Sequence, residues 1–158
     1  MNKDIIVKDD NIYFNCRCCA IIIYNQQLLV QKREDDLYWA LPGGKIKIGE
    51  SSFEAIHREL FEELKIDNIT KAELVDVNEY FFTDNNYLCH QNIFTYFIQL
   101  DDYSMIAESN LKDICEAGLI FKWYSIDNIS SKDIKPDYLK EQILPNKVRK
   151  LNRIYRED

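Results

Sequence analysis

Three glutamates are the residues of this chain whose type and spacing best suit chemistry. Glu59, Glu62 and Glu63 stand three and four positions apart within the stretch RELFEELKI. On a helix this spacing places them on one face, with Cβ atoms about 5–6 Å apart. Carboxylates this close raise each other's pKa, and a hard divalent cation such as Mg²⁺ would relieve their repulsion. A solvated acidic helix face is the alternative interpretation.

The residues around this acidic face also suit a metal site. Gly43 and Gly44 allow a tight turn that exposes a backbone carbonyl or amide close to a ligand. Arg58 could form a bidentate pair with Glu50 or Glu59 and so hold a ligand carboxylate in place. The sequence therefore predicts a loop, a helix and a supporting arginine around one cation.

A helix that starts near residue 52 would carry these acids. Ser51 and Glu54 form an S-x-x-E capping box. An apolar stripe follows and predicts a core-facing side, made of Phe53, Ile56, Leu60 and Leu64. At about 100° per residue, we place the acidic face about 120° from this stripe, so the carboxylates need not enter the core.

The remaining elements predict a mixed α/β layered fold. We expect an edge element within residues 1–15, a hairpin of strands 19–24 and 28–33, and a short strand within 37–44. Further strands are expected at 72–82, 88–100 and 118–126. The segment 136–156 reads as a terminal helix interrupted by Pro145.

Composition limits the classes of function. The chain has 158 residues, which predicts a single domain over residues 1–158. Its net charge of −7 argues against a nucleic-acid polymer as partner, whereas a nucleotide bound through a cation is compatible with it. No apolar stretch approaches the ~18 residues of a membrane span and no signal peptide is visible, so we expect a cytoplasmic protein without membrane contact.

The five cysteines predict reduced, structural thiols, with a metal or redox role as the alternative. Their spacing lacks the paired pattern of a zinc site. They are Cys16, Cys18, Cys19, Cys89 and Cys115.

The stretch from Gly44 to Ile66 resembles the Nudix box, G-x5-E-x7-R-E-U-x-E-E-x-G-U, where U is aliphatic. One specified position departs, because Lys65 stands where the pattern has its second glycine. WALPGG before the box and FKWYSIDNI near the end of the chain are also similar to family segments. The positions on pattern are Gly44, Glu50, Arg58, Glu59, Leu60, Glu62, Glu63 and Ile66.

This resemblance implies an α/β/α sandwich around a mixed sheet, and Mg²⁺- or Mn²⁺-dependent hydrolysis of a nucleoside diphosphate linked to another group. It implies that Glu62, Glu63 and the Gly43 carbonyl bind metal, and that Glu59 binds metal or acts as general base. Arg58, Glu50 and Gly44 would support the site. Water activated by the metal would attack the pyrophosphate, so no covalent nucleophile is required.

Residues outside the box are expected to set the substrate. Glu79 and Glu116 are candidates for an extra acid, and Arg17 and Phe82 for substrate contacts, although a strand-edge charge and a packing role are the alternatives for the last two. Members of the resembled family that act on ADP-ribose tend to carry a proline some way after the box, and this chain has none between residues 42 and 136. The resemblance therefore disfavours an ADP-ribose pyrophosphatase and makes a MutT-like enzyme acting on nucleoside triphosphates, oxidised ones included, the first hypothesis.

Two further hypotheses concern binding rather than chemistry. A non-catalytic domain that senses a nucleotide is disfavoured, because such domains usually lose a box charge and this chain keeps all of them. The basic tail KVRKLNRIYR reads as a solvated helix face, with a homodimer contact as the alternative.

Overall fold

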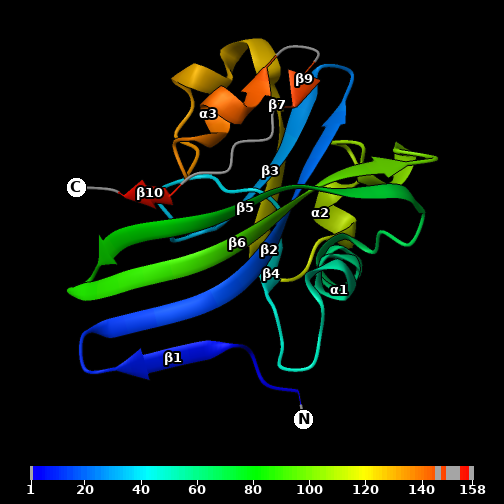
Figure 1. Cartoon of the computed structure of the whole chain (residues 1–158). Helices are drawn as coiled ribbons and strands as arrows, with labels where there is room; N and C mark the ends of the chain where they lie inside the picture. Colours follow the sequence, from blue (N-terminus) through cyan, green and yellow to red (C-terminus); the bar gives the residue numbers. More distant parts are fainter. Residues whose placement is uncertain (1, 145–146, 149–153, 157–158) are drawn as a thin grey trace.

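The computed structural model describes residues 2–144, 147–148 and 154–156, and a mixed β-sheet occupies its centre (Figure 1). Six strands follow one another in the order β10-β5-β6-β2-β3-β7, and β1 and β4 both pair with β2. The strands are β1 Ile6–Asp9, β2 Ile12–Tyr24, β3 Gln27–Arg33, β4 Gly43–Lys45, β5 Ile69–Asp84, β6 Tyr87–Leu100, β7 Leu119–Ser125 and β10 Ile154–Arg156. A separate pair is formed by β8 Ile143–Leu144 and β9 Lys147–Val148.

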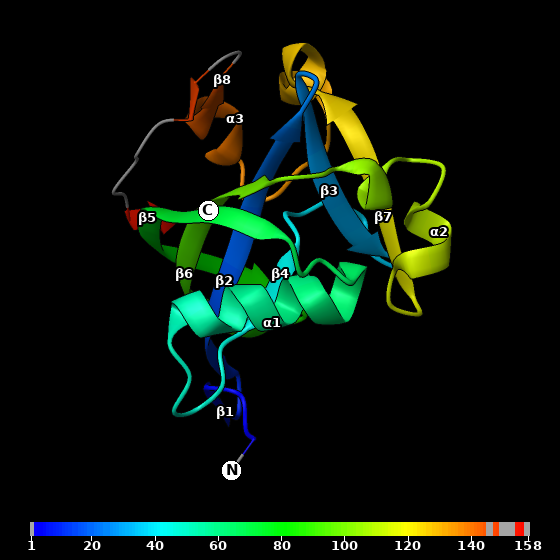
Figure 2. The ribbon, with the colours of Figure 1, turned by 90° about the vertical axis from the view of Figure 1, so that its right-hand side faces the viewer.

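Helical segments cover both faces of this sheet. They are α1 Ser52–Leu64, α2 Leu111–Ile114 and α3 Leu139–Gln142, with 3₁₀ turns η1 Ser104–Ile106 and η2 Ile126–Ser131. Figure 2 shows α1 lying across one face while α3 lies beyond the sheet on the other side. The expected layered α/β class is therefore confirmed. Within the described ranges, no helix is long and apolar enough to span a membrane.

Each sheet face has its own core, because side chains alternate along a strand. On β2, Cys18, Ala20 and Ile22 pack beneath α1. The intervening Cys19 and Ile21 pack on the opposite face. Even-numbered residues in this part of β2 therefore face α1, and odd-numbered residues face the opposite side of the sheet.

The α1 helix begins as predicted, with both hydrogen bonds of the Ser51–Glu54 capping box present. Ile56, Leu60 and Leu64 are fully buried beneath it. The prediction for Phe53 is wrong, since its side chain is 50% exposed. Phe53 lies in the first turn and packs on the His57 ring, with centroids 4.5 Å apart, rather than in the core.

The helix ends at Lys65, which adopts the left-handed conformation with φ 58° and ψ 24°. Its backbone N–H donates to the carbonyls of Leu60 and Phe61. Glycine usually occupies this position because a Cβ there is strained. Lysine keeps the same ending, and its ammonium donates to the Glu62 carbonyl at 3.1 Å.

The hairpin of β2 and β3 is confirmed, and its turn uses the positive φ of Asn25 and Gln26. The predicted strand within 37–44 is displaced. Only residues 43–45 form a strand, β4, which pairs with β2, while Trp39 and Ala40 make isolated bridges. The three later strands are confirmed and run slightly longer than predicted in β5 and β6.

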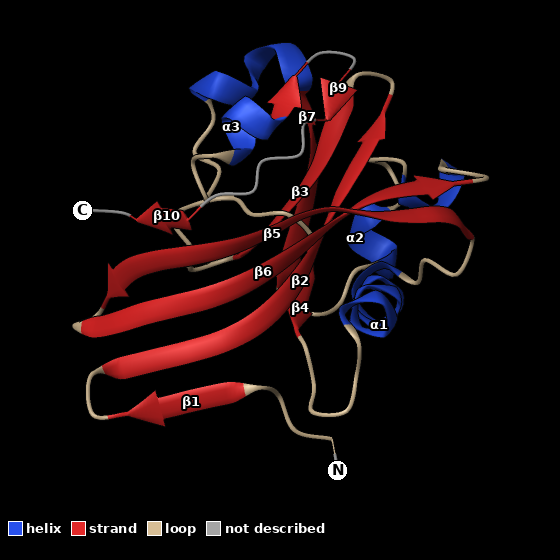
Figure 3. Cartoon of the chain, viewed as in Figure 1, coloured by secondary structure: helices blue, strands red, loops and turns tan. Residues whose placement is uncertain are grey.

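The predicted terminal helix is wrong for the described residues. Only the four residues of α3 are helical, and β8, β9 and β10 follow as strands (Figure 3). Proline disfavours the helical region for the residue before it, so Leu144 is extended ahead of Pro145. β10 then pairs in parallel with the edge of β5. Pro145, and half of the basic tail expected to be a solvated face, residues 149–153, lie outside the described residues.

Candidate functional site

Arg58 lies at the centre of a network of carboxylates on α1. Its Nε and Nη2 donate to the two carboxylate oxygens of Glu50 at 2.7 and 3.0 Å. Nη1 donates to Glu59 at 2.6 Å and to Glu62 at 3.2 Å, and Nη2 also reaches the Lys45 carbonyl at 3.0 Å. One guanidinium therefore connects the loop before α1 to two of the three candidate ligands.

The three acids differ sharply in burial. The Glu62 side chain is 49% exposed and that of Glu59 14%, whereas Glu63 is 5% exposed as a residue. The expectation that the carboxylates need not enter the core is therefore wrong for Glu63, which is buried. Seven residues advance a helix by about 700°, which places Glu63 only about 20° from Ile56, at the edge of the apolar stripe.

Burial controls the charge on these groups. It raises the pKa of Glu63 to about 8, and the neighbouring Glu59 charge adds to the effect. Burial also raises the pKa of Glu59, against the opposing hydrogen bond from Arg58. The Arg58 hydrogen bond holds the pKa of Glu50 below its usual range. Negative charge on Glu59 and Glu63 is thus costly in the protein alone.

The two glycines of β4 bring the backbone against these acids. The Gly43 N–H donates to Glu63 Oε2 at 3.2 Å. Gly43 has φ 145°, and a Cβ there would overlap the Cys18 carbonyl oxygen. At Gly44 an added Cβ would lie 2.5 Å from the Glu59 carboxylate. Each glycine therefore allows a close approach that any other residue would prevent.

The donor chemistry at this position fits a hard cation such as Mg²⁺. The available groups are carboxylates and a backbone carbonyl, all oxygen donors. The structure's described portion contains no group of three acidic, histidine or cysteine side chains already arranged to hold a metal ion. In this arrangement the Arg58 guanidinium contacts both Glu59 and Glu62.

A pocket of about 630 Å³ lies on the sheet face opposite α1. Both residues expected to contact substrate, Arg17 and Phe82, line it. Tyr80 and Phe82 stack within it at 4.7 Å between centroids, with 24° between the ring planes. Gln91 of β6 also lines it. Its other walls come from the loop after β3 and the segment before α3, and include Asp35, Asp36, Leu37, Tyr38, Leu41, Lys135, Pro136 and Tyr138.

Arg17 links this pocket to the acids on the other face. It lines the pocket from β2, and its Cα partner on β4 is Lys45. Its positive charge lowers the pKa of both Glu59 and Glu63. A positive charge on the wall of a cavity of nucleotide size thus also acts on the acidic face.

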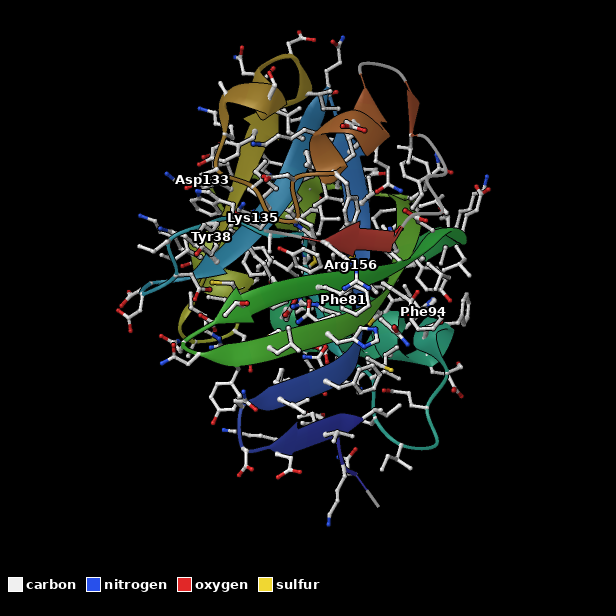
Figure 4. The ribbon with its side chains drawn as sticks, turned by 60° about the vertical axis from the view of Figure 1, so that its left-hand side comes forward. Tyr38, Phe81, Phe94, Asp133, Lys135 and Arg156 are labelled. Carbon is white, nitrogen blue, oxygen red and sulfur yellow. The ribbon has the colours of Figure 1, made fainter. Side chains whose placement is uncertain are left out.

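Figure 4 shows Tyr38 and Lys135 side by side at the rim of the pocket, near Asp133. The Lys135 ammonium lies 5.9 Å from the Tyr38 ring centroid. The Trp39 N–H donates to the Asp133 carbonyl at 2.8 Å. This backbone contact joins the two loops that form the rim.

The two candidates for an extra acid do not join the three box acids. Glu79 lies on β5 beside Tyr80 and therefore faces away from the pocket. Its carboxylate lies 3.5 Å from His90 Nε2 on the neighbouring strand. Glu116 has an exposed side chain, and only its backbone N–H approaches the site, by donating to the Glu63 carbonyl at 2.8 Å.

The region around Glu79 has a packing explanation. Phe81 stacks on the His90 ring at 4.2 Å, and the Arg156 guanidinium lies 4.0 Å from the Phe81 centroid, as Figure 4 shows. Phe14 meets His90 edge-on at 5.1 Å. These stacked side chains attach β10 to the sheet. Packing therefore accounts for the aromatic residues near Glu79, and no bound ligand is needed to explain them.

The cysteines are all free thiols. Cys18 is fully buried beneath the Gly44 carbonyl, and burial raises its pKa to about 12. Cys19 hydrogen bonds to Thr95 at 3.3 Å. Neither resembles a reactive thiolate, which agrees with the expected structural role.

Some residues around the site were not identified from the sequence. Gln31 contacts the Gly43 carbonyl from β3, and Tyr80 and Tyr138 line the pocket. A polar Gln31 within the apolar run LLVQ was a signal for the first. The i, i+2 spacing of Tyr80 and Phe82 on one strand face was a signal for the aromatic wall.

Comparison with known proteins adds to this geometry. A model of the NUDIX domain matches residues 15–145. A Bacillus subtilis (strain 168) protein, named as a candidate 8-oxo-dGTP diphosphatase, is 37% identical over 70 residues, which cover 43% of this chain. The matched region spans about half of that relative's length, 47%.

Two solved structures resemble the fold. The MutT protein of Bacillus halodurans superposes with a TM-score of 0.65 at 18% identity, over 90% of this chain and 89% of that one. A NUDIX hydrolase from Nitrosomonas europaea superposes with a TM-score of 0.53 at 21% identity, over 83% and 92% of the two chains. At these identities the likeness concerns the fold, and it agrees with the expected sandwich.

Proposed function

The chain belongs to the NUDIX domain family, and on that premise we propose that it hydrolyses a pyrophosphate bond in a nucleoside diphosphate derivative, with Mg²⁺ or Mn²⁺ as cofactor. One observation carries the proposal. Arg17 lines a pocket of about 630 Å³, and its charge stabilises the ionised forms of Glu59 and Glu63, which crowd each other on the acidic face of α1. A nucleoside in the pocket would place its phosphates over Arg17, next to that face.

Glu59, Glu62, Glu63 and the Gly43 carbonyl are the groups that would hold the cation. Their donors are hard oxygens, and their mutual repulsion favours a bound positive charge. Bound metal would supply Lewis-acid activation of the phosphate and of a water molecule. Glu59, which is half-buried and hydrogen bonded to Arg58, is the carboxylate we assign to proton removal from that water.

The supporting residues would keep this arrangement in place. Arg58 holds Glu50 through two hydrogen bonds and so fixes the loop that precedes α1. Gly44 leaves room for the Glu59 carboxylate. Catalytic groups that are held in position before substrate arrives lower the cost of reaching the transition state.

We propose nucleoside triphosphates, oxidised ones included, as the first substrate class. The name of the Bacillus subtilis relative supports this choice, and the stacked Tyr80 and Phe82 rings offer a surface for a base. ADP-ribose is the second class to test. The aromatic wall accepts the flat face of either base, so the phosphate-linked part of the substrate must discriminate between them.

A substrate panel tests the proposal. Nucleoside triphosphates, 8-oxo-dGTP, ADP-ribose, dinucleoside polyphosphates and NADH would be incubated with Mg²⁺ or Mn²⁺, and the products identified. We expect hydrolysis of a triphosphate and its loss in Glu62→Gln. Undiminished activity of that variant would contradict the assignment of the acidic face to metal, and hydrolysis of no substrate would favour a nucleotide-binding module instead.

A further inference from the structure

We infer that Gln31 is a positioning residue of the metal site, an inference that rests on the proposed role of Gly43 and Glu63. Its Nε2 donates to the Gly43 carbonyl at 3.4 Å. The same side chain also lowers the pKa of Glu63, against the larger effect of burial, so it stabilises the ionised carboxylate. A single amide therefore contacts one of the groups that would bind the cation and acts on a second.

The backbone of β3 aims this side chain at the site. Leu29, two residues earlier on the same strand, packs in the core beneath α1, so Gln31 projects toward the same face. Its own N–H and C=O both pair with Ala40 at 2.8 Å. These two bonds tie Gln31 to the loop that leads directly into Gly43.

The burial of this amide is not explained by packing. Gln31 is only 7% exposed. Its Oε1 is buried and lacks a hydrogen-bond partner among the residues the structure describes. A buried acceptor left unpaired destabilises a fold, so an apolar residue of the same size would pack better here.

The orientation of the amide follows from its neighbours. Turning it over would place Oε1 against the Gly43 carbonyl oxygen, and two acceptors cannot share a hydrogen bond. Oε1 therefore faces away from Gly43 and meets no donor among the residues that the structure describes. A water in the hydration shell of Mg²⁺ or Mn²⁺ would supply one, because Mg²⁺ usually keeps several waters.

Direct titration with Mn²⁺ alone tests this assignment. Gln31→Met keeps the side-chain length and removes both hydrogen-bonding groups. Groups that orient metal ligands in this way typically change metal affinity about 10–100-fold when removed. We expect Mn²⁺ to bind Gln31→Met more weakly by that factor, by calorimetry or by the spin-resonance signal of free Mn²⁺, while the thermal midpoint stays equal or rises.

A matched control lies on the same strand. Gln27→Met makes the same exchange at the start of β3, where Gln27 pairs with Ser125 and Tyr24. We expect its Mn²⁺ affinity to stay within about twofold of the parent protein, a spread too small to represent a lost ligand contact. If Gln31→Met does not fold, Gln31→Asn serves instead, because it keeps the amide but shortens its reach.

The outcomes separate this inference from the proposed function. Folded Gln31→Met or Gln31→Asn with Mn²⁺ affinity within twofold of the parent protein overturns the inference, as does a parent protein without a Glu63-dependent Mn²⁺ site. Weakened Mn²⁺ binding in the variant supports it. If that weakening is seen but the parent hydrolyses no nucleotide, the proposed function fails and the positioning role of Gln31 stands.

Discussion

The substitution Gly44→Ala should damage the acid site while leaving the fold intact. An alanine Cβ at this position would lie 2.5 Å from the Glu59 carboxylate, whereas ordinary contacts begin at 3.4 Å. The carboxylate must therefore move by about 0.9 Å, away from its 2.6 Å bond to Arg58. A misplacement of about 1 Å in a catalytic group can cost about 100-fold in rate.

Stability should hardly change in this variant. Gly44 does not have a positive φ, so alanine adopts the backbone conformation without strain. The alanine also restricts the unfolded chain, which stabilises by about 0.4–1 kcal/mol and offsets the cost of moving one flexible side chain. Since 1 kcal/mol corresponds to about 2–4 °C at this length, we expect a thermal midpoint within about 3 °C of the parent protein.

The assay combines phosphate release from the preferred nucleotide with thermal unfolding. Two glycines serve as controls. Gly49→Ala has no neighbour within 4 Å but a φ of 85°, so it should lose about 1 kcal/mol of stability and keep its activity. Gly43→Ala should unfold the protein, because its Cβ meets the Cys18 backbone. A Gly44→Ala variant that retains half of kcat/KM would refute the role given to the position of Glu59.

Three further substitutions test the neighbouring parts of the site. Arg58→Lys should lower the free energy of unfolding by about 2 kcal/mol and reduce kcat, because an ammonium cannot reproduce the paired bonds to Glu50. A thermal midpoint that calorimetry finds unchanged would contradict this. Lys65→Gly should relieve left-handed strain and stabilise by about 1 kcal/mol, with kcat within twofold of the parent; a several-fold rise in turnover would show that the lysine affects catalysis. Arg17→Met should raise KM for the nucleotide about tenfold, which corresponds to the loss of one charge-assisted hydrogen bond. An unchanged KM in steady-state kinetics would show that Arg17 does not bind the phosphates.

The long strands and the α1 helix were predictable because their signals are local. The alternating runs of β5 and β6 and the capping box at Ser51 depend only on near neighbours. The terminal helix was not predictable in the same way. Pro145 interrupts its pattern, and the residues of β10 become a strand only because the edge of β5 is open for pairing.

The sequence by itself determined which residues form the acidic face. Helical spacing puts Glu59, Glu62 and Glu63 on one side of α1. These relations hold in any structure that contains the helix, because they follow from its 3.6-residue turn.

Only the tertiary structure decided how these acids differ from one another. Glu63 is buried because α1 is rotated so that its apolar stripe faces β2, and Glu62 remains exposed for the same reason. Arg17 and Gln31 reach the site from strands whose register and parity fix their direction. Such contacts join segments far apart in the chain, so packing between elements, and not local spacing, determines them.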